Sequence, residues 1–159
     1  MAHEIERKFL VVDRGIVTGR TGERLVQGYL AIGTTTVRVR IAGAVAWLTV
    51  KGPAERSVRA EFEYPIPLVD ANAMLVLCVV PPIEKVRYLI EHAGHIWEVD
   101  VFEGANAPLV VAEVELDAAD EAVELPEWIG YEVTDDPRYL NARLAERPFS
   151  RWEAITKNP

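Results

Sequence analysis

Hydrophobic and polar residues alternate along most of this chain, which is the pattern of half-buried β-strands. In the opening stretch EIERKFL, the charged residues Glu4, Glu6 and Lys8 share one parity, while apolar Ile5 and Phe9 take the other. Runs of this kind, each bounded by Gly, Pro, Asn or Asp, predict eight strands at about 3–12, 24–32, 35–42, 45–51, 58–66, 84–92, 95–103 and 109–117.

The connections between these runs are mostly short. Gly43 in IAGAVAWL and Gly94 in EHAGHIW each separate two runs and predict tight hairpin turns. Eight strands joined largely by hairpins favour a mainly β fold of the α+β kind, in which an antiparallel sheet is large enough to close into a barrel with a few flanking helices. The sequence contains no internal repeat and no linker, so we predict a single domain over residues 1–159.

One helix is predicted in the middle of the chain. Asp70 is the expected N-cap, the apolar stretch over about 71–79 forms the helix, and Pro81 with Pro82 ends it. This stretch contains Cys78, the single cysteine, which we expect to be a buried and inert thiol. A single cysteine also excludes an internal disulfide and a cysteine-cluster metal site.

A second helix is predicted near the C-terminus. Asp136 is its expected cap, Pro137 its first helical residue, and it stops before Pro148. This helix could cap one mouth of a barrel, or it could pack on the barrel exterior. Its polar and aromatic residues are Arg138, Tyr139, Asn141 and Arg143.

Composition and charge narrow the class of protein. The chain has 159 residues, a formal net charge of −8 and half of its residues apolar, which is typical of a soluble globular domain. No apolar run approaches the roughly 18 residues of a membrane span, and the charged N-terminus is unlike a signal peptide, so we expect a cytoplasmic protein without a membrane partner. The negative charge disfavours sequence-independent nucleic-acid binding.

The charges on the alternating runs carry both signs in similar number. The cations are Lys8, Arg38, Arg40, Lys51, Arg59, Lys85 and Arg87, and the anions are Glu4, Glu6, Glu61, Glu63, Glu98, Asp100, Glu113 and Glu115. For any one strand, a face turned to solvent explains the pattern. A solvated face would also contain Ser, Thr, Asn and Gln, however, and these positions are nearly all ionic. If the faces converge inside a barrel, they need a ligand, because unpaired buried charges are very costly.

A ligand that satisfies both signs is a complex of a metal with a polyphosphate. Carboxylates bind hard cations such as Mg²⁺ or Mn²⁺, and arginine and lysine bind phosphate oxygens. The sequence therefore indicates phosphoryl chemistry in a polar barrel. No P-loop is involved, since TGRTGERL lacks the Gly-Lys-Ser/Thr ending.

The stretch EIERKFL resembles the Glu-x-Glu-x-Lys signature of the CYTH superfamily, the triphosphate tunnel metalloenzymes. Further blocks resemble short bacterial members in the same order: QGYL, VRVR, WLTVKG, EFEYPIP, IEKVRYLI, WEVDVFEG, AEVEL and YEVTDDPRYLN. The resemblance implies an eight-stranded antiparallel tunnel and a divalent metal. It also implies a triphosphate substrate, since members hydrolyse tripolyphosphate or thiamine triphosphate, cyclise ATP, or remove RNA 5′ phosphates.

The resemblance also implies roles for individual residues. Metal ligands would come from Glu4, Glu6, Glu113 and Glu115, with Asp100 and Glu61 or Glu63 nearby. Phosphate contacts would come from Lys8, Arg38, Arg40, Lys51, Lys85 and Arg87, with Arg59 in the matching parity. Tripolyphosphatases of this kind carry a Tyr–Lys pair, and Tyr29 and Lys85 take the matching positions, so they would be the catalytic pair. Alternatively, Tyr29 is a wall residue whose hydroxyl bonds to a neighbour.

Within the family we expect an inorganic tripolyphosphatase, working as a monomer or a homodimer. Thr36 stands where the mammalian thiamine triphosphatase has the tryptophan that stacks on thiamine. The alternatives are an adenylate cyclase, a nucleoside or thiamine triphosphatase, and a non-catalytic polyphosphate-binding module. His3, His92 and His95 are predicted to be solvent-exposed residues of the N-terminus and a turn, with no metal-binding role.

Overall fold

The computed structural model describes residues 3–153 and 157, and these form a barrel of antiparallel strands with a few short helices. The strands are β1 (His3–Val11), β2 (Glu23–Ala31), β3 (Thr36–Ala42), β4 (Val45–Lys51), β5 (Val58–Ile66), β6 (Ile83–His92), β7 (His95–Phe102), β8 (Val110–Glu115) and β9 (Ile129–Glu132). The helices are α1 (Leu68–Leu75) and α2 (Asn141–Glu146), with 3₁₀ turns at Arg14–Val17, Gly104–Asn106, Pro137–Tyr139 and Phe149–Arg151. All eight predicted strands are confirmed to within two residues at each end.

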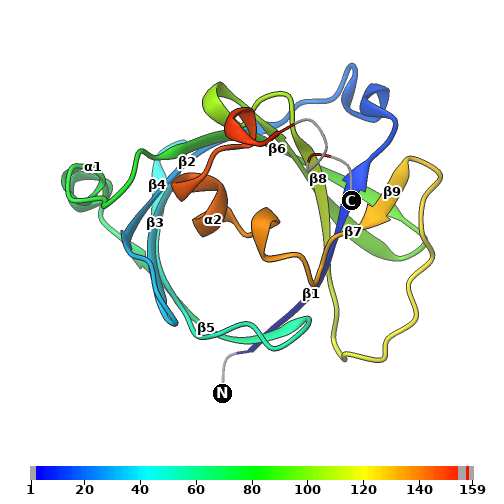
Figure 1. Cartoon of the computed structure of the whole chain (residues 1–159), viewed down its shortest axis with the longest axis horizontal. Coiled ribbons are helices and arrows are strands. Elements are labelled where there is room, and N and C mark those ends of the chain that lie inside the picture. The colour runs from blue at the N-terminus through cyan, green and yellow to red at the C-terminus, as the bar shows by residue number, and fades with distance from the viewer. Residues whose placement is uncertain (1–2, 154–156, 158–159) are drawn as a thin grey trace.

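The sheet closes on itself through β1. Its strand order is β5-β4-β3-β2-β6-β7-β8-β1, and β1 also pairs with β5, which completes the ring seen in Figure 1. The N-terminal part of β1 pairs with β5, and the part from Glu6 to Leu10 pairs with β8 on the other edge. The predicted closed antiparallel barrel of eight strands is therefore confirmed. The additional strand β9, which pairs with the C-terminal end of β1, was not predicted.

Both predicted hairpin turns are confirmed. Ala42 pairs with Val45 around Gly43, whose φ is 59°. His92 pairs with His95 around Ala93 and Gly94, whose φ values of 48° and 82° place both central residues in the left-handed region.

The first helix begins earlier than predicted. It follows Pro67, so Asp70 lies in the first turn instead of at the cap, and the helix ends at Leu75. The residues after it are exposed, with Val76 at 84% exposure. As a result Cys78 is half-buried, and the prediction of a fully buried thiol is wrong. Burial raises the pKa of that thiol.

The second helix is also shorter than predicted. Asp136 caps the 3₁₀ turn Pro137–Tyr139, accepting a hydrogen bond from the backbone N–H of Arg138, and α2 starts only at Asn141. Of the residues described, none belongs to a helix with the length and apolar character needed to cross a membrane.

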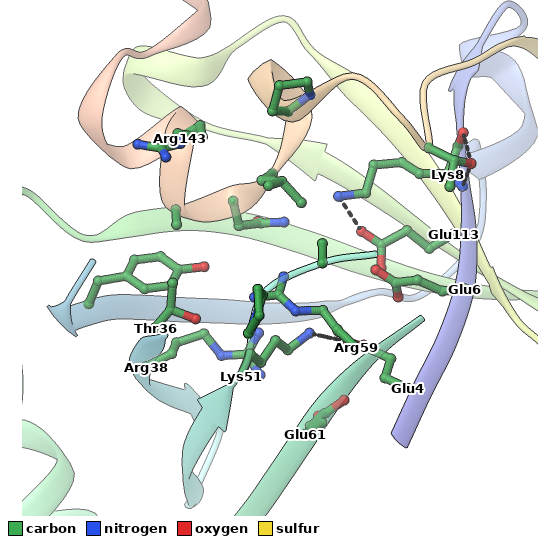
Figure 2. Close-up of a pocket in the computed structure, with 18 of the residues that line it drawn as sticks. Glu4, Glu6, Lys8, Thr36, Arg38, Lys51, Arg59, Glu61, Glu113 and Arg143 are labelled. Carbon is green, nitrogen blue, oxygen red and sulfur yellow. Dashed lines mark hydrogen bonds and ion pairs between the residues drawn. The ribbon is translucent and has the colours of Figure 1, made fainter. Parts of the chain in front are cut away.

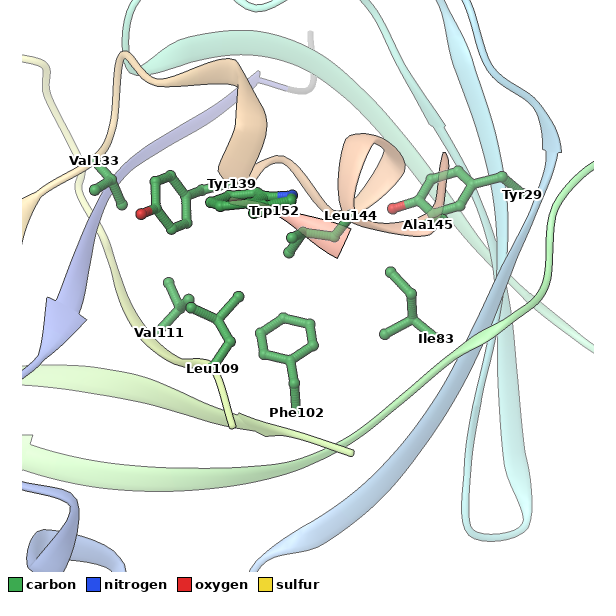
Figure 3. Packing of buried hydrophobic residues seen from close by; sticks show 10 residues of the cluster. All are labelled: Tyr29, Ile83, Phe102, Leu109, Val111, Val133, Tyr139, Leu144, Ala145 and Trp152. Atoms are coloured by element: carbon green, nitrogen blue, oxygen red, sulfur yellow. The ribbon is translucent and has the colours of Figure 1, made fainter. Parts of the chain in front are cut away.

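Apolar residues pack on both faces of the barrel wall. Outside it, Trp97 and Phe9 form part of one cluster, and Ala71 of α1 covers Val39 in another. Inside the barrel a third cluster fills one end. There the C-terminal residues Val133, Tyr139, Leu144, Ala145 and Trp152 pack against Tyr29, Ile83, Phe102, Leu109 and Val111 (Figure 3). The C-terminal segment therefore enters the barrel instead of packing on its exterior, and the polar cavity lies beyond this apolar filling.

Candidate active site: a charged tunnel inside the barrel

A cavity of about 880 Å³ lies inside the barrel. Alternate residues of a strand point to the same face, and the charged residues of the alternating pattern point toward this cavity. The charged side chains of different strands therefore meet in one space. The predicted site residues that line it are Glu4, Glu6, Lys8, Tyr29, Arg38, Arg40, Lys51, Arg59, Glu61, Glu63, Arg87, Glu113 and Glu115. Lys85 and Asp100 are not among the lining residues.

Carboxylates from β1 and β8 form one side of the cavity (Figure 2). Glu113 lies opposite Lys8 in the β1–β8 ladder, and the Lys8 ammonium is 3.3 Å from its Oε1. Burial alone would raise the pKa of Glu113, but Lys8 and Arg87 outweigh it and hold that pKa well below its usual value. Glu4 likewise meets Lys51, whose Nζ is 2.7 Å from Oε2, and its pKa is lowered.

Glu6 is the exception on this side. Burial and the negative charges of Glu113 and Glu4 raise the pKa of Glu6 well above its usual value. A buried carboxyl held beside two carboxylates is stabilised either by a proton or by a bound cation. Oxygen donors from carboxylates are what Mg²⁺ and Mn²⁺ prefer, so this donor set fits a hard divalent cation in its chemistry.

The side chains are not arranged as a finished metal centre. Within residues 3–153 and 157, no three His, Cys, Asp or Glu side chains converge closely enough to hold a metal ion. The reason is visible in the ion pairs, because Glu4 is turned to Lys51 and Glu113 to Lys8.

The predicted residues of β5, and Glu115 of β8, also line the cavity. Glu61 is half-buried, and burial together with Glu4 raises its pKa although Lys51 opposes the shift. Glu63 accepts hydrogen bonds from the Thr49 hydroxyl at 2.7 Å and from Arg38 at 3.4 Å, and it is therefore oriented by β3 and β4. Arg59 donates to the backbone carbonyl of Gly52. Glu115 is exposed at the end of β8.

Arginines of β3 face the carboxylates from the opposite side. Arg40 donates from Nε to Oε1 of Gln27 at 2.9 Å, and no carboxylate of the described residues forms an ion pair with it. Burial and the neighbouring cations Arg38 and Arg87 lower the pKa of Arg40 to about 10. Arg38 is buried and Arg40 is half-buried, and Arg38 Nε has no hydrogen-bond partner in the described structure. Two guanidinium groups with unsatisfied hydrogen-bonding capacity are suited to binding an anion.

Lys85 and Asp100 point into the barrel but are fully covered by neighbouring side chains, Lys85 by Asn141 of α2. The Lys85 ammonium is 2.6 Å from Asp100 Oδ2, and Arg87 grips the same carboxylate with Nε at 2.8 Å and a second nitrogen at 2.9 Å. Burial would raise the pKa of Asp100, but Lys85 and Arg87 lower it. Burial and the nearby Arg87 and Arg40 lower the pKa of Lys85 against the opposing effect of Asp100. In this structure the groups that cover Lys85 and Asp100 close them off from the cavity.

Several lining residues were not assigned a role from the sequence. Glu98 lines the cavity and pairs with Arg87, and burial raises its pKa. Arg56 and Arg143 also line it, the latter from α2 (Figure 2). The alternating charge pattern contained Glu98. The sequence placed Arg143 on the helix that could cap a barrel mouth, without a role in the site, and Arg56 lies in a loop, where period-two spacing gives no signal.

The hairpin histidines do not face open solvent as predicted. His95 Nε2 lies 2.6 Å from Glu121 Oε1, and His92 Nε2 lies 3.7 Å from Glu124, so both meet the loop after β8. His3 is exposed, as predicted, and it also lines the cavity at the start of β1.

The closed antiparallel barrel, with carboxylates set against guanidinium and ammonium groups in its lumen, defines the class of this protein as a barrel with a charged interior cavity. The particular family follows from comparison: the CYTH domain matches residues 2–147, and the chain belongs to the CYTH family. The resemblance noted in the sequence is thereby confirmed.

The chain is similar to curated relatives over nearly their whole length. It is 43% identical over 155 residues to an inorganic triphosphatase of Acetivibrio thermocellus, covering 96% of this chain and 99% of that protein. An inorganic triphosphatase of Nitrosomonas europaea is 36% identical over 151 residues, covering 89% and 96%.

Solved structures share the fold. The crystal structure of the inorganic triphosphatase NE1496 is 34% identical with a TM-score of 0.66, covering 91% of this chain and 95% of that one. HpAC1 from Hippeastrum, named as a candidate adenylyl cyclase in which a triphosphatase activity dominates, is 16% identical with a TM-score of 0.58 and covers 72% and 80%. At that identity the likeness shows the fold alone.

Proposed function

We propose that this protein hydrolyses inorganic tripolyphosphate to pyrophosphate and orthophosphate with the help of a divalent metal ion. The observation that carries the proposal is that the guanidinium groups of Arg38 and Arg40 line the same cavity as the carboxylates of Glu4, Glu6 and Glu113. Figure 2 shows Arg38 across this cavity from Glu6 and Glu113. The relatives named as inorganic triphosphatases support the same reaction class.

The phosphate chain would lie along the cationic side. Arg40 and the free Nε of Arg38 supply directed hydrogen bonds to phosphate oxygens, and these bonds are strong where water is excluded. Lys8 and Lys51, which now face Glu113 and Glu4, supply further positive charge at the boundary between the two sides.

The metal, Mg²⁺ or Mn²⁺, would be held by Glu4, Glu6 and Glu113, with Glu61 and Glu115 near enough along the same wall to assist. When bound, such an ion shields the charge of the phosphoryl groups and favours attack on phosphorus. The protein's contribution is to fix these carboxylates on the rigid strands β1 and β8.

In the proposed reaction a water oxygen forms a bond to the terminal phosphorus, and the bridging P–O bond breaks. Pyrophosphate leaves with the electron pair of that bond, and one proton of the attacking water passes to its leaving oxygen. Tyr29 is the predicted catalytic residue that lines the cavity, so its hydroxyl is placed to orient the attacking water. The buried Lys85 acts on the reaction only through the groups it contacts.

The lining favours an inorganic substrate over a nucleotide or thiamine triphosphate. Among the described lining residues, the only aromatic side chains are Tyr29 and His3, and Tyr29 is 4% exposed. A nucleobase or a thiamine ring therefore has little ring surface on which to stack. Thr36, which has no aromatic ring, is one of the residues that line the cavity (Figure 2).

A substrate panel tests the proposal. Pyrophosphate, tripolyphosphate, ATP and thiamine triphosphate are each incubated with Mg²⁺, with Mn²⁺ and with a chelator, and the products are separated by anion-exchange chromatography. We expect one orthophosphate and one pyrophosphate per tripolyphosphate, and no turnover with the chelator. Formation of cyclic AMP without tripolyphosphate cleavage would indicate a cyclase instead. Calorimetric binding of tripolyphosphate without cleavage would indicate a binding module.

A further inference from the structure

Asn141, the first residue of α2, reaches into the barrel and connects two groups of lumen cations. Its Oδ1 accepts a hydrogen bond from Lys85 Nζ at 3.0 Å and another from Gln27 Nε2 at 3.2 Å. Gln27 in turn accepts from Arg40 Nε at 2.9 Å. Lys85 and Gln27 are fully buried, and Asn141 lines the cavity. The C-terminal segment thus contacts Gln27, the residue that accepts the hydrogen bond of Arg40.

The chemistry of the groups fixes the direction of this chain of hydrogen bonds. Lysine and arginine side chains only donate, so each end of the chain must meet an acceptor. Asn141 therefore turns its carbonyl oxygen to Lys85, and Gln27 must turn its amide nitrogen to Asn141 and its carbonyl oxygen to Arg40. With both amides in this orientation, each of the three hydrogen bonds joins a donor to an acceptor.

Arg40 depends on this arrangement because it has little else to hold it. No carboxylate of the described residues pairs with Arg40, and Gln27 provides its hydrogen-bond acceptor. By contrast, Arg87 is gripped by Asp100 and also meets Glu98. An ion pair with a carboxylate would orient Arg40 too, but it would neutralise the charge that binds an anion. A neutral amide orients the guanidinium and leaves its charge available.

We propose that Asn141 is a positioning residue, which acts through Gln27 to aim the Arg40 guanidinium at the bound polyphosphate. The activity readout of this inference rests on the proposed function, whereas the orientation of Arg40 can be measured without substrate. The backbone supports the same coupling, because the carbonyl of Tyr139 in this segment accepts from Lys8 Nζ at 3.1 Å. The C-terminal segment therefore supplies acceptors to cations on two sides of the cavity.

The matched control is Asn106, which is also buried and also holds the C-terminal segment. Its side chain accepts from the Phe149 backbone N–H at 2.9 Å and donates to the Leu144 carbonyl at 3.5 Å, but it contacts none of the lumen cations. Asn106→Ala therefore loosens the segment without touching Gln27 or Arg40. Asn141→Asp keeps an acceptor oxygen in the same shape, and Asn141→Ala removes it.

The test measures the Nε–H resonance of Arg40 by NMR in the free protein, with steady-state kinetics on tripolyphosphate beside it. We expect Asn141→Ala to weaken or shift the Arg40 resonance and to raise KM about tenfold or more, as for loss of a hydrogen bond that orients a charged group. Asn141→Asp should retain the resonance, and Asn106→Ala should retain both resonance and KM while lowering the melting temperature.

Asn141→Ala and Gln27→Ala should also be non-additive in KM, since both act through Arg40. An unchanged Arg40 resonance in Asn141→Ala, or a KM effect equal to that of Asn106→Ala, would overturn the positioning role. If the wild-type protein does not cleave tripolyphosphate, the proposed function fails, and the resonance of Arg40 still decides this inference.

Discussion

Lys8 and Glu113 face each other across the β1–β8 ladder, and their side chains form an ion pair of 3.3 Å inside the barrel. This pair joins the two halves of the site, because a phosphate would compete for the ammonium and a metal for the carboxylate. The burial of Lys8 lowers its pKa, yet Glu113 and Glu6 more than compensate and raise it. The ion pair therefore holds both charged side chains in the cavity until a phosphate binds the ammonium and a metal binds the carboxylate.

The carboxylate side predicts the effect of removing one metal ligand. Glu6→Gln should weaken Mg²⁺ or Mn²⁺ binding by at least about tenfold, because it removes an oxygen charge from a buried donor set. Isothermal titration calorimetry with each metal measures the change. Glu23→Gln, at an exposed position of β2, is the control and should bind like the wild type. Equal affinities for both variants would exclude Glu6 as a ligand.

Replacing an arginine of the cationic side with lysine should weaken substrate binding. Arg40→Lys keeps the charge but loses the forked donor geometry, so KM for tripolyphosphate should rise about tenfold. Arg24→Lys is the control, since Arg24 pairs with Glu84 and Glu103 away from the cavity. If Arg40→Lys leaves KM unchanged, charge alone suffices at this position.

The hydroxyl of Tyr29 can be tested separately from its ring. Tyr29→Phe should lower kcat by about a hundredfold while leaving metal affinity unchanged, if the hydroxyl orients the attacking water. Tyr131→Phe, on the exposed strand β9, should behave like the wild type. A wild-type kcat for Tyr29→Phe would make Tyr29 a wall residue, as in the alternative drawn from the sequence.

Asp100 predicts a pH-dependent loss of stability. Asp100→Asn leaves Lys85 and Arg87 buried without their carboxylate, so the free energy of unfolding at pH 7 should fall by roughly 3–5 kcal/mol. Because the folded protein lowers the pKa of Asp100, its stabilisation is present above the ordinary pKa of about 4 and is lost as the pH falls through the lower folded value.

Urea unfolding at several pH values measures this difference, which should shrink toward pH 2 as the wild-type carboxyl becomes protonated. Asp120→Asn, in the exposed loop after β8, is the control and should be neutral throughout. A constant difference at all pH values would mean that the variant acts through packing and not through charge.

Alternation in the sequence was sufficient to predict the strands and the face that each charge occupies. It placed Glu6 and Arg40 in the lumen because side-chain parity is a local property of a strand. It could not show depth: Lys85 and Asp100 have the lumen parity, as Arg87 does, yet they are fully buried and do not line the cavity. Depth depends on how a neighbouring strand and α2 cover the residue.

Neutral side chains and short elements escaped prediction for different reasons. Gln27 and Asn141 are uncharged, so the charge pattern passed over them, although they join the cations of β3 and β6. The strand β9 is four residues long and depends on pairing with β1. The C-terminal helix was predicted too long because Asp136 and Pro137 start a 3₁₀ turn equally well.

The apolar filling at one end of the barrel bears on the order of events in the proposed reaction. Because Tyr139, Leu144 and Trp152 pack into that end, we expect substrate and products to enter and leave by the opposite end of the barrel. Of the two products, the one nearer that end must then leave before the one that lies deeper in the barrel, so product release is sequential. Product-inhibition kinetics should accordingly show competition with tripolyphosphate by the last product to leave.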